Sequence, residues 1–154
     1  MQITLKQTKP SPIPPQVKFY GVGADQVYEF WHMVEPLIEK ALEYSDGKYE
    51  IWDIFNSIES KEMQLWLVTE DKKIIGCGVT QIVVYPQKNI CLIVLLAGED
   101  FDKWAHFLNE VKEWAKDIGC KSIETYGRPG WERKLKNWTK IHTVLRINLD
   151  ENLH

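Results

Sequence analysis

The chain has 154 residues, of which 44% are apolar and 27% are charged. This composition excludes an intrinsically disordered chain, and the length suits one domain that buries a single core without disulfide or metal support. The formal net charge of −3 is unevenly distributed, since residues 120–146 carry +5 and the remainder carries −8. Such a basic segment can steer an anionic ligand toward itself, although an ordinary solvated helix face has the same composition.

The N-terminal part of the chain is predicted to be an arm followed by two helices. Four of the seven prolines lie close together near the N-terminus, so residues 1–16 are expected to form an extended arm. Apolar residues recur every three or four positions from residue 25 to residue 42, which predicts a helix that Pro36 kinks or divides. A shorter helix is predicted over residues 49–58, with Trp52 on its buried side.

Four segments have the apolar patterns that are typical of strands. They are residues 17–20, 65–70, 73–85 and 90–97. Short polar turns join the last three segments, which predicts an antiparallel meander. The longest apolar run has the length of a strand and not of a membrane span, and the N-terminus lacks the apolar stretch of a signal peptide. We therefore expect a cytoplasmic protein with no membrane partner.

The C-terminal third is predicted to contain a crossover helix and two further strands. The helix is expected from Asp100 to Ile118, with Asp100 as its N-cap. Its length fits a parallel crossover into a strand over residues 121–127. A short helix then precedes a final strand over residues 139–149.

The three cysteines, Cys77, Cys91 and Cys120, form no CxxC pair, and two of them lie within apolar runs. We expect all three to be reduced and mostly buried. No histidine lies near cysteines or carboxylates at the spacing of metal ligands, so no metal site is expected.

This order of elements resembles that of the GNAT superfamily of acyl-CoA-dependent N-acyltransferases. Residues 123–149, IETYGRPGWERKLKNWTKIHTVLRINL, are similar to GNAT-like proteins encoded by tailed phages and prophages. The resemblance implies one domain of the α/β (α+β) class over residues 17–149, followed by a tail at residues 150–154. Its mixed, mostly antiparallel central sheet would contain a splayed parallel pair of strands, with helices on both faces.

The resemblance also implies that acetyl-CoA binds between the two parallel strands and donates its acetyl group to an amine. In the family, a Q/RxxGxG/A turn and the helix after it hold the pyrophosphate through backbone N–H groups. The corresponding turn here, residues 95–104, reads LLAGEDFDKW and keeps only Gly98 of the glycines. The carboxylates of Glu99, Asp100 and Asp102 lie where a phosphate would approach.

Positive charge for the phosphates would then come from the basic C-terminal region. Residues 126–138, YGRPGWERKLKNW, contain two of the three arginines, whose planar forks of donors suit phosphate. The backbone of residues 95–98 would hold the pantetheine. The residues expected to bind acetyl-CoA are Leu95, Leu96, Ala97, Gly98, Lys103, Arg128, Arg133 and Lys134.

Catalysis in the family often uses a tyrosine on the short last helix, and that position falls on Arg133 in this chain. Arginine cannot act as a general acid near neutral pH. Glu124 and Tyr126 lie two residues apart on one predicted strand, so their side chains should share a face. They are the candidate base and acid, although a Glu/Tyr face can also be a hydrogen-bonded pair near solvent.

Two hypotheses follow. The first is an N-acetyltransferase that uses acetyl-CoA and an amine acceptor. The second is a non-catalytic, phage-associated accessory or assembly protein on the same fold, with a degenerate CoA site and a protein partner that contacts residues 126–138. Trp131 and Trp138 beside basic residues resemble a nucleic-acid surface, but the acidic body and the lack of a recognised motif disfavour nucleic acid as a partner.

Overall fold

The computed structural model describes residues 16–127 and 130–150. A five-stranded sheet forms its centre, with the strands in the order β1-β2-β3-β4-β5. Neighbouring strands are antiparallel except for β4 and β5, which are parallel. The strands are β1 (Val17–Val22), β2 (Met63–Glu70), β3 (Lys73–Val84), β4 (Asn89–Gly98) and β5 (Cys120–Thr125). The predicted mixed, mostly antiparallel sheet is thus confirmed.

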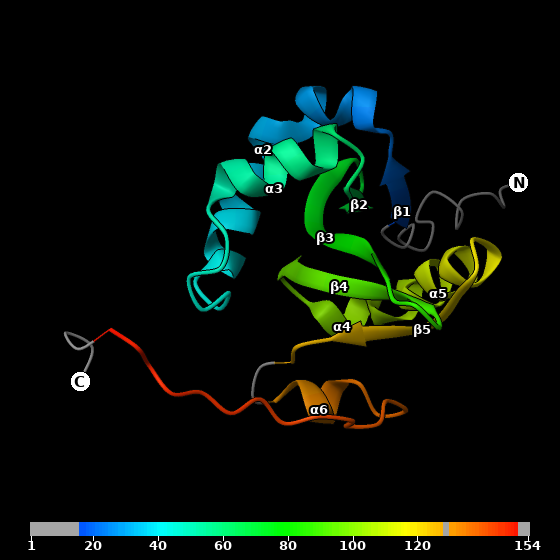
Figure 1. Ribbon diagram of the computed structural model, residues 1–154. Coiled ribbons are helices and arrows are strands. Elements are labelled where there is room, and N and C mark those ends of the chain that lie inside the picture. The colour runs from blue at the N-terminus through cyan, green and yellow to red at the C-terminus, as the bar shows by residue number, and fades with distance from the viewer. Residues whose placement is uncertain (1–15, 128–129, 151–154) are drawn as a thin grey trace, which may run out of the picture.

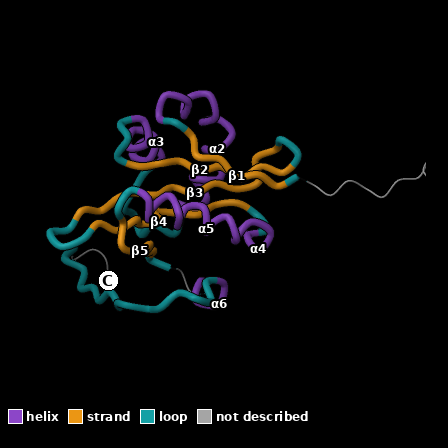
Figure 2. The backbone as a smooth tube through the Cα atoms, turned by 90° about the vertical axis from the view of Figure 1, so that its right-hand side faces the viewer, coloured by secondary structure: helices purple, strands orange, loops and turns teal. Residues whose placement is uncertain are grey.

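Two helices cover one face of the sheet and a third covers the other (Figures 1 and 2). After a short 3-10 turn, η1 (Ala24–Gln26), α2 (Val27–Leu42) and α3 (Ile51–Glu59) pack on the first face, and α5 (Leu108–Asp117) packs on the second. The buried side chains of α2 are spaced by four, three and four residues, which is the period of one helix face. They are Val27, Trp31, Val34 and Ile38.

The helical layer differs from expectation at two points. Pro36 lies inside α2 and does not divide it, which leaves a kink as the remaining expectation. The second helix begins at Ile51, where the carboxylate of Asp53 accepts the Glu50 backbone N–H at 2.8 Å and so satisfies a donor at the helix start. Trp52 is 58% exposed, because Ile54 and Phe55 form the buried side of this helix.

The predicted crossover helix is divided into three pieces. α4 (Phe101–Trp104) is followed by the 3-10 turn η2 (Ala105–Phe107) and then by α5. Asp100 is not the side-chain cap that was expected, because its backbone is left-handed and its carboxylate makes no capping hydrogen bond. The break coincides with Trp104, which leaves helical backbone geometry while its buried ring packs over Gly76 of β3.

The predicted strand over residues 139–149 is absent. After α6 (Trp131–Lys134) and the buried Leu135, the chain runs as an exposed, irregular segment along the outside of the domain (Figure 1). Strand geometry needs a neighbouring strand for its hydrogen bonds, and none of the described strands pairs with this segment. The expected arm over residues 1–16 lies outside the described residues, apart from Gln16.

The three cysteines are free and buried, as expected. Burial raises the pKa of the Cys77 and Cys91 thiols to about 12, and it also raises the pKa of Cys120. Thiolates are the reactive form of cysteine. The native thiols should therefore resist alkylation while the protein is folded.

The buried thiols should make the protein less stable as the pH rises. A thiol in the unfolded chain ionises near pH 8.5, whereas Cys77 stays protonated to about pH 12 in the fold. Its stabilising contribution is complete below the unfolded pKa and is lost as the pH rises toward the folded pKa. Between pH 8 and pH 10 we expect Cys77 to account for a loss of about 2 kcal/mol in the free energy of unfolding.

Urea unfolding of wild type and Cys77→Ala at these two pH values measures this contribution. The wild type should lose about 2 kcal/mol more than Cys77→Ala over the interval, because the variant lacks one thiol that ionises on unfolding. Equal losses in the two proteins would contradict the assignment.

Candidate functional site

The parallel strands β4 and β5 part before β4 ends. Their pairing runs only to Ile93 and Thr125, where the Thr125 hydroxyl donates a hydrogen bond to the Ile93 carbonyl at 3.1 Å. β4 continues to Gly98 with no partner on the β5 side in the described sheet. Its pairing with β3 skips Val94, so a bulge lies at the point where the strands separate.

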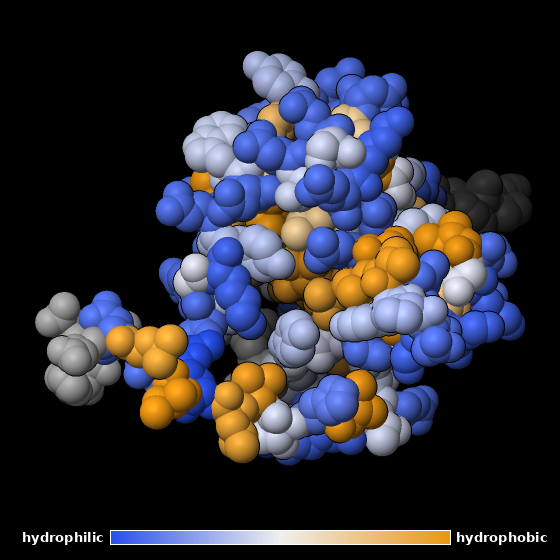
Figure 3. Space-filling model, viewed as in Figure 1, coloured by the Kyte–Doolittle hydropathy of each residue, from blue (hydrophilic) through white to orange (hydrophobic). Residues whose placement is uncertain are grey.

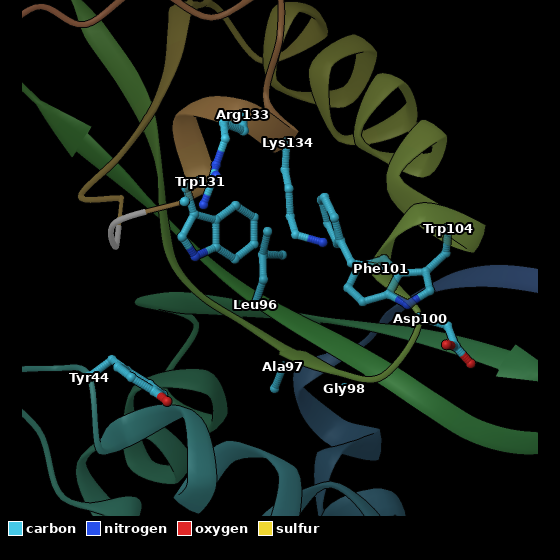
Figure 4. A pocket seen from close by; sticks show the side chains of 11 residues that line it. Tyr44, Leu96, Ala97, Gly98, Asp100, Phe101, Trp104, Trp131, Arg133 and Lys134 are labelled. Carbon is cyan, nitrogen blue, oxygen red and sulfur yellow. The ribbon is translucent and has the colours of Figure 1, made fainter.

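A cavity of about 610 Å³ opens between the end of β4 and α6 (Figure 4). Its floor is the unpaired end of β4, and α4 and α6 form its wall. The turn after α2 contributes Tyr44 on the opposite side (Figure 4). The lining residues are Tyr44, Leu96, Ala97, Gly98, Asp100, Phe101, Trp104, Gly130, Trp131, Arg133 and Lys134.

Three aromatic side chains hold the wall of this cavity together. The ring of Phe101 meets that of Trp104 at 4.9 Å and that of Trp131 at 5.0 Å between centroids, edge to face in both cases. Such pairs contribute about 0.5–1.5 kcal/mol each beyond the burial of apolar area. Because α6 is only one turn long, it depends on such contacts, together with the buried Leu135 that follows it, to stay beside the cavity.

The turn between β4 and α4 is occupied by its own chain. The Glu99 N–H donates to the Ile75 carbonyl at 3.2 Å, and the Trp104 indole N–H donates to the Glu99 carbonyl at 2.9 Å. Gly98 has a positive φ and lies against β3, where a Cβ would come within 2.3 Å of the Ile75 oxygen. The backbone N–H and carbonyl of Glu99 are therefore committed to β3 and to Trp104.

The charges around the cavity are divided between α4 and α6. Lys103 does not line it, since its ammonium lies 2.9 Å from the carboxylate of Glu70, and this hydrogen bond raises the pKa of Lys103. Lys134 lines the cavity and lies 3.9 Å from Asp102. Arg133 also lines it and has no carboxylate partner among the described residues. Arg128, the other arginine expected here, lies outside the described residues.

Glu124 and Tyr126 have different neighbours. Ile123 packs with the cluster under α5, so alternation along β5 turns Glu124 toward the face covered by α2 and α3. The Ser122 hydroxyl donates to its carboxylate at 3.2 Å. Tyr126 lies beyond the end of β5, is 72% exposed, and has the Lys48 ammonium 5.0 Å from its ring. No hydrogen bond joins the two side chains within the described part of the chain.

Other predicted site residues lie at the cavity, but six of its eleven lining residues were not predicted to bind acetyl-CoA, namely Tyr44, Asp100, Phe101, Trp104, Gly130 and Trp131. Leu96, Ala97, Gly98, Arg133 and Lys134 line it, whereas Leu95 is buried under α2 and α3. Sequence reasoning missed Tyr44, whose phenol oxygen points into the cavity in Figure 4. Its position in the polar turn after α2, where a core residue is not expected, was the available signal.

No protein-family model matches the sequence, and no curated protein is similar to it. Solved structures are similar in fold. An aminoglycoside N-acetyltransferase, AAC(6')-Iy in complex with CoA, has a TM-score of 0.65 and 11% identity over 90% of this chain and 97% of its own. A ribosomal-protein-alanine N-acetyltransferase from Brucella melitensis biovar Abortus 2308 has a TM-score of 0.58 and 9% identity over 86% of this chain and 100% of its own.

A GNAT family acetyltransferase from Staphylococcus aureus has a TM-score of 0.57 and 12% identity over 86% of this chain and 98% of its own. At these identities the similarity shows the fold. The chain therefore has the fold of the GNAT acetyltransferases, as its order of elements predicts. No helix among the described residues is long and apolar enough to cross a membrane.

Proposed function

We propose that the protein is an N-acetyltransferase that moves an acetyl group from acetyl-CoA to an amine. The observation that carries this proposal is the cavity at the end of the parallel strand pair, with unpaired strand backbone as its floor and two cations on its wall. Ligands of open sheets with parallel strands commonly bind outside the carboxyl ends of those strands. The structural neighbour AAC(6')-Iy, which has this fold, was solved with CoA.

The end of β4 is suited to pantetheine, which contains two amides. Backbone N–H and C=O groups that face away from β3 over residues 94–98 have no strand partner in the described sheet. Pantetheine amides can pair with such groups as an added strand would. In this proposal Leu95, Leu96, Ala97 and Gly98 supply the backbone that holds pantetheine.

The phosphates are assigned to α6 and not to the turn after β4. In that turn the Glu99 backbone N–H and carbonyl are already hydrogen-bonded, and Asp100 places a carboxylate at the cavity. Arg133 has no acidic partner among the described residues and can form two parallel hydrogen bonds with a phosphate. Lys134 adds a second cation. Arg128, in the same segment, is proposed as a third contact.

In the proposed reaction the amine nitrogen attacks the thioester carbonyl, and a C–N bond forms. The C–S bond then breaks, and the electron pair leaves with the sulfur of CoA. Glu124 accepts the proton that the amine loses, and Tyr126 donates a proton to the thiolate. Glu124 pairs with Leu92 just before the point where β4 and β5 separate, and Tyr126 follows just after that point. Neither residue lines the cavity, so the proposal places the thioester at the end of the cavity nearest to β5. Because acetyl-CoA is an intracellular metabolite and the thiols are free, we place the reaction in the cytoplasm.

Arg133→Ala should weaken the binding of CoA by about tenfold, because one charge-assisted contact with a phosphate is lost. Isothermal titration calorimetry with CoA measures this effect. Lys136→Ala is the matched control, since it removes the same charge from the same basic segment at an exposed position outside the cavity lining. Equal dissociation constants for the two variants would contradict the assignment of Arg133.

The reaction itself can be tested by measuring the thiol of CoA that is released. The buried native thiols should contribute little background in such an assay. Acetyl-CoA should lose its acetyl group only when an amine is present. The structural neighbours suggest two amines to try first, an aminoglycoside and a peptide with an N-terminal alanine. Bound acetyl-CoA that stays intact with every amine tested would contradict an enzymatic function.

A second candidate function rests on the turn after β4. This turn keeps only Gly98 of the family's glycines, its Glu99 backbone groups are already hydrogen-bonded, and Arg133 stands where the family's tyrosine is expected. These departures favour a non-catalytic protein. In this alternative, which takes its phage association from the sequence resemblance alone, the chain is an accessory or assembly protein and residues 126–138 contact a protein partner. Failure to bind CoA at all would favour this alternative.

A further inference from the structure

The C-terminal segment of the chain ties together the two walls of the cavity beside β4. One wall includes α6, and the opposite wall is the turn after α2, which contributes Tyr44. Residues 139–150, here called the strap, lead away from α6 and reach that turn, where Arg146 forms an ion pair with Asp46 (Figure 1). Because Asp46 is two residues from Tyr44, the strap is fastened next to the wall of the cavity.

Ion pairs hold the strap in place, and burial contributes little. Its large apolar side chains are exposed, with Leu145 at 89%. Figure 3 shows apolar side chains standing out along the strap at the lower left of the molecule. Lys140 lies 3.7 Å from Glu132, but this contact joins the strap to α6 and does not reach the opposite wall. The contact that does reach it is that of Arg146 with Asp46.

The ion pair of Arg146 with Asp46 can open while the domain stays folded. Its two side chains are 53% and 47% exposed. The hydrogen bond from Arg146 lowers the pKa of Asp46, so the carboxylate is charged at neutral pH and the pair is complete there. Exposed ion pairs add little to stability and are screened by salt, so this contact should break and re-form readily.

The turn that holds Asp46 has features that favour movement. Asp46 and Gly47 both have positive φ, at +61° and +73°. The Ser45 hydroxyl oxygen is buried and has no hydrogen-bond partner among the described residues. A left-handed backbone at a residue other than glycine and an unsatisfied buried hydroxyl both cost free energy in this arrangement. A second arrangement of the turn can therefore compete once Arg146 lets go.

We propose that the strap is a gate for the cavity. While Arg146 holds Asp46, the turn after α2 is kept near α6 and the mouth of the cavity stays narrow. When the pair opens, the turn and the strap separate, and a ligand can enter or leave between the two walls. The proposal concerns ligand exchange, and it is independent of whether that ligand is acetyl-CoA.

A thiol placed in the cavity reports this opening without any ligand. Ala97→Cys puts a thiol on the cavity floor, while the native thiols stay unreactive because they are buried and their pKa values are raised. Mass spectrometry then follows the rate at which a bulky, neutral maleimide labels the introduced thiol.

In the Ala97→Cys background, Asp46→Asn and Arg146→Gln should each raise the labelling rate about two- to fivefold, which is the population shift expected from losing one exposed ion pair. Asparagine tolerates the positive φ of Asp46, so the turn itself is preserved. The double variant should label no faster than either single variant, because both changes break the same contact. Added salt should raise the rate of Ala97→Cys alone and leave that of the Asp46→Asn variant unchanged.

Two control variants remove the same charges elsewhere. Lys140→Gln takes a cation from the strap without touching the contact across the cavity, and Glu43→Gln takes an exposed carboxylate from the end of α2. Both should label at the rate of Ala97→Cys alone. Unchanged rates in the Asp46 and Arg146 variants, equal increases in the controls, or labelling of Cys77 at the same raised rate would overturn the gate. Since no CoA is used, this failure is distinguishable from a failure of the proposed acetyl transfer.

Discussion

Gly98→Ala should lower the free energy of unfolding by about 3 kcal/mol or more, because it adds a steric clash to an unfavourable backbone conformation. Gly98 has a φ of +125°, and an added Cβ would lie 2.3 Å from the Ile75 oxygen and 2.5 Å from the Gly76 Cα. Both atoms belong to the backbone of β3, so neither can move aside as a flexible side chain could. Since Gly98 also lines the cavity, the variant should lose acetyl-CoA binding along with stability.

Gly119→Ala is the matched control for this prediction. Gly119 also has a positive φ, but an added Cβ would meet no atom within 4 Å. Gly119→Ala should therefore lower the free energy of unfolding only by the backbone strain, about 1 kcal/mol. Urea unfolding measures both variants, and equal losses at the two glycines would show that close packing of Gly98 against β3 is not what requires glycine there.

Glu124→Gln should lower the rate of acetyl transfer by about 10²–10⁴-fold, because glutamine cannot accept the proton that the amine loses. The change preserves the shape of the side chain and its hydrogen bond with Ser122, so acetyl-CoA binding should stay as in the wild type. The measurement is the turnover number from release of CoA thiol, with binding followed by calorimetry.

Glu113→Gln removes the same charge from the exposed side of α5, on the opposite face of the sheet, and should leave the rate unchanged. If Glu124→Gln kept the wild-type rate, the proton would have to go to another group or to water. If it lost acetyl-CoA binding as well, Glu124 would have a structural role and not a catalytic one.

The elements that the sequence predicted well are those whose periodicity reflects burial. α2 and the strands of the meander each bury one face or both, so their apolar residues repeat at the period of a helix or a strand. The order of these elements was enough to identify the fold. A parallel crossover after the meander predicted the parallel pairing of β4 and β5, whereas the parting of these strands was implied only by the resemblance to the GNAT superfamily.

The errors arise where long-range contacts override a local pattern. The helix that starts after Asp100 breaks because Trp104 packs over Gly76, which is far away in the sequence. Residues 139–149 have the pattern of a strand but no partner in the described chain, and a strand is defined by its partner. Neither outcome can be derived from the residues of the segment itself.

The candidate site was predicted in outline and not in its contacts. The basic segment that contains Arg133 and Lys134 does lie at the cavity. The sequence could not show that Glu70 pairs with Lys103, nor that Phe101 and Trp131 meet to hold α6 in place, because these are contacts between distant elements. The aromatic residues of the basic segment thus have a structural role that composition alone could not separate from ligand binding.

Titration of acetyl-CoA into the wild-type chain by calorimetry tests the central claim most directly. We predict that one molecule binds per chain with micromolar affinity, that CoA competes with it, and that added salt weakens binding because the phosphates meet Arg133 and Lys134. Folded protein that gives no binding heat with millimolar acetyl-CoA, and no competition in a second assay, would contradict an acyl-CoA site in the cavity beside β4.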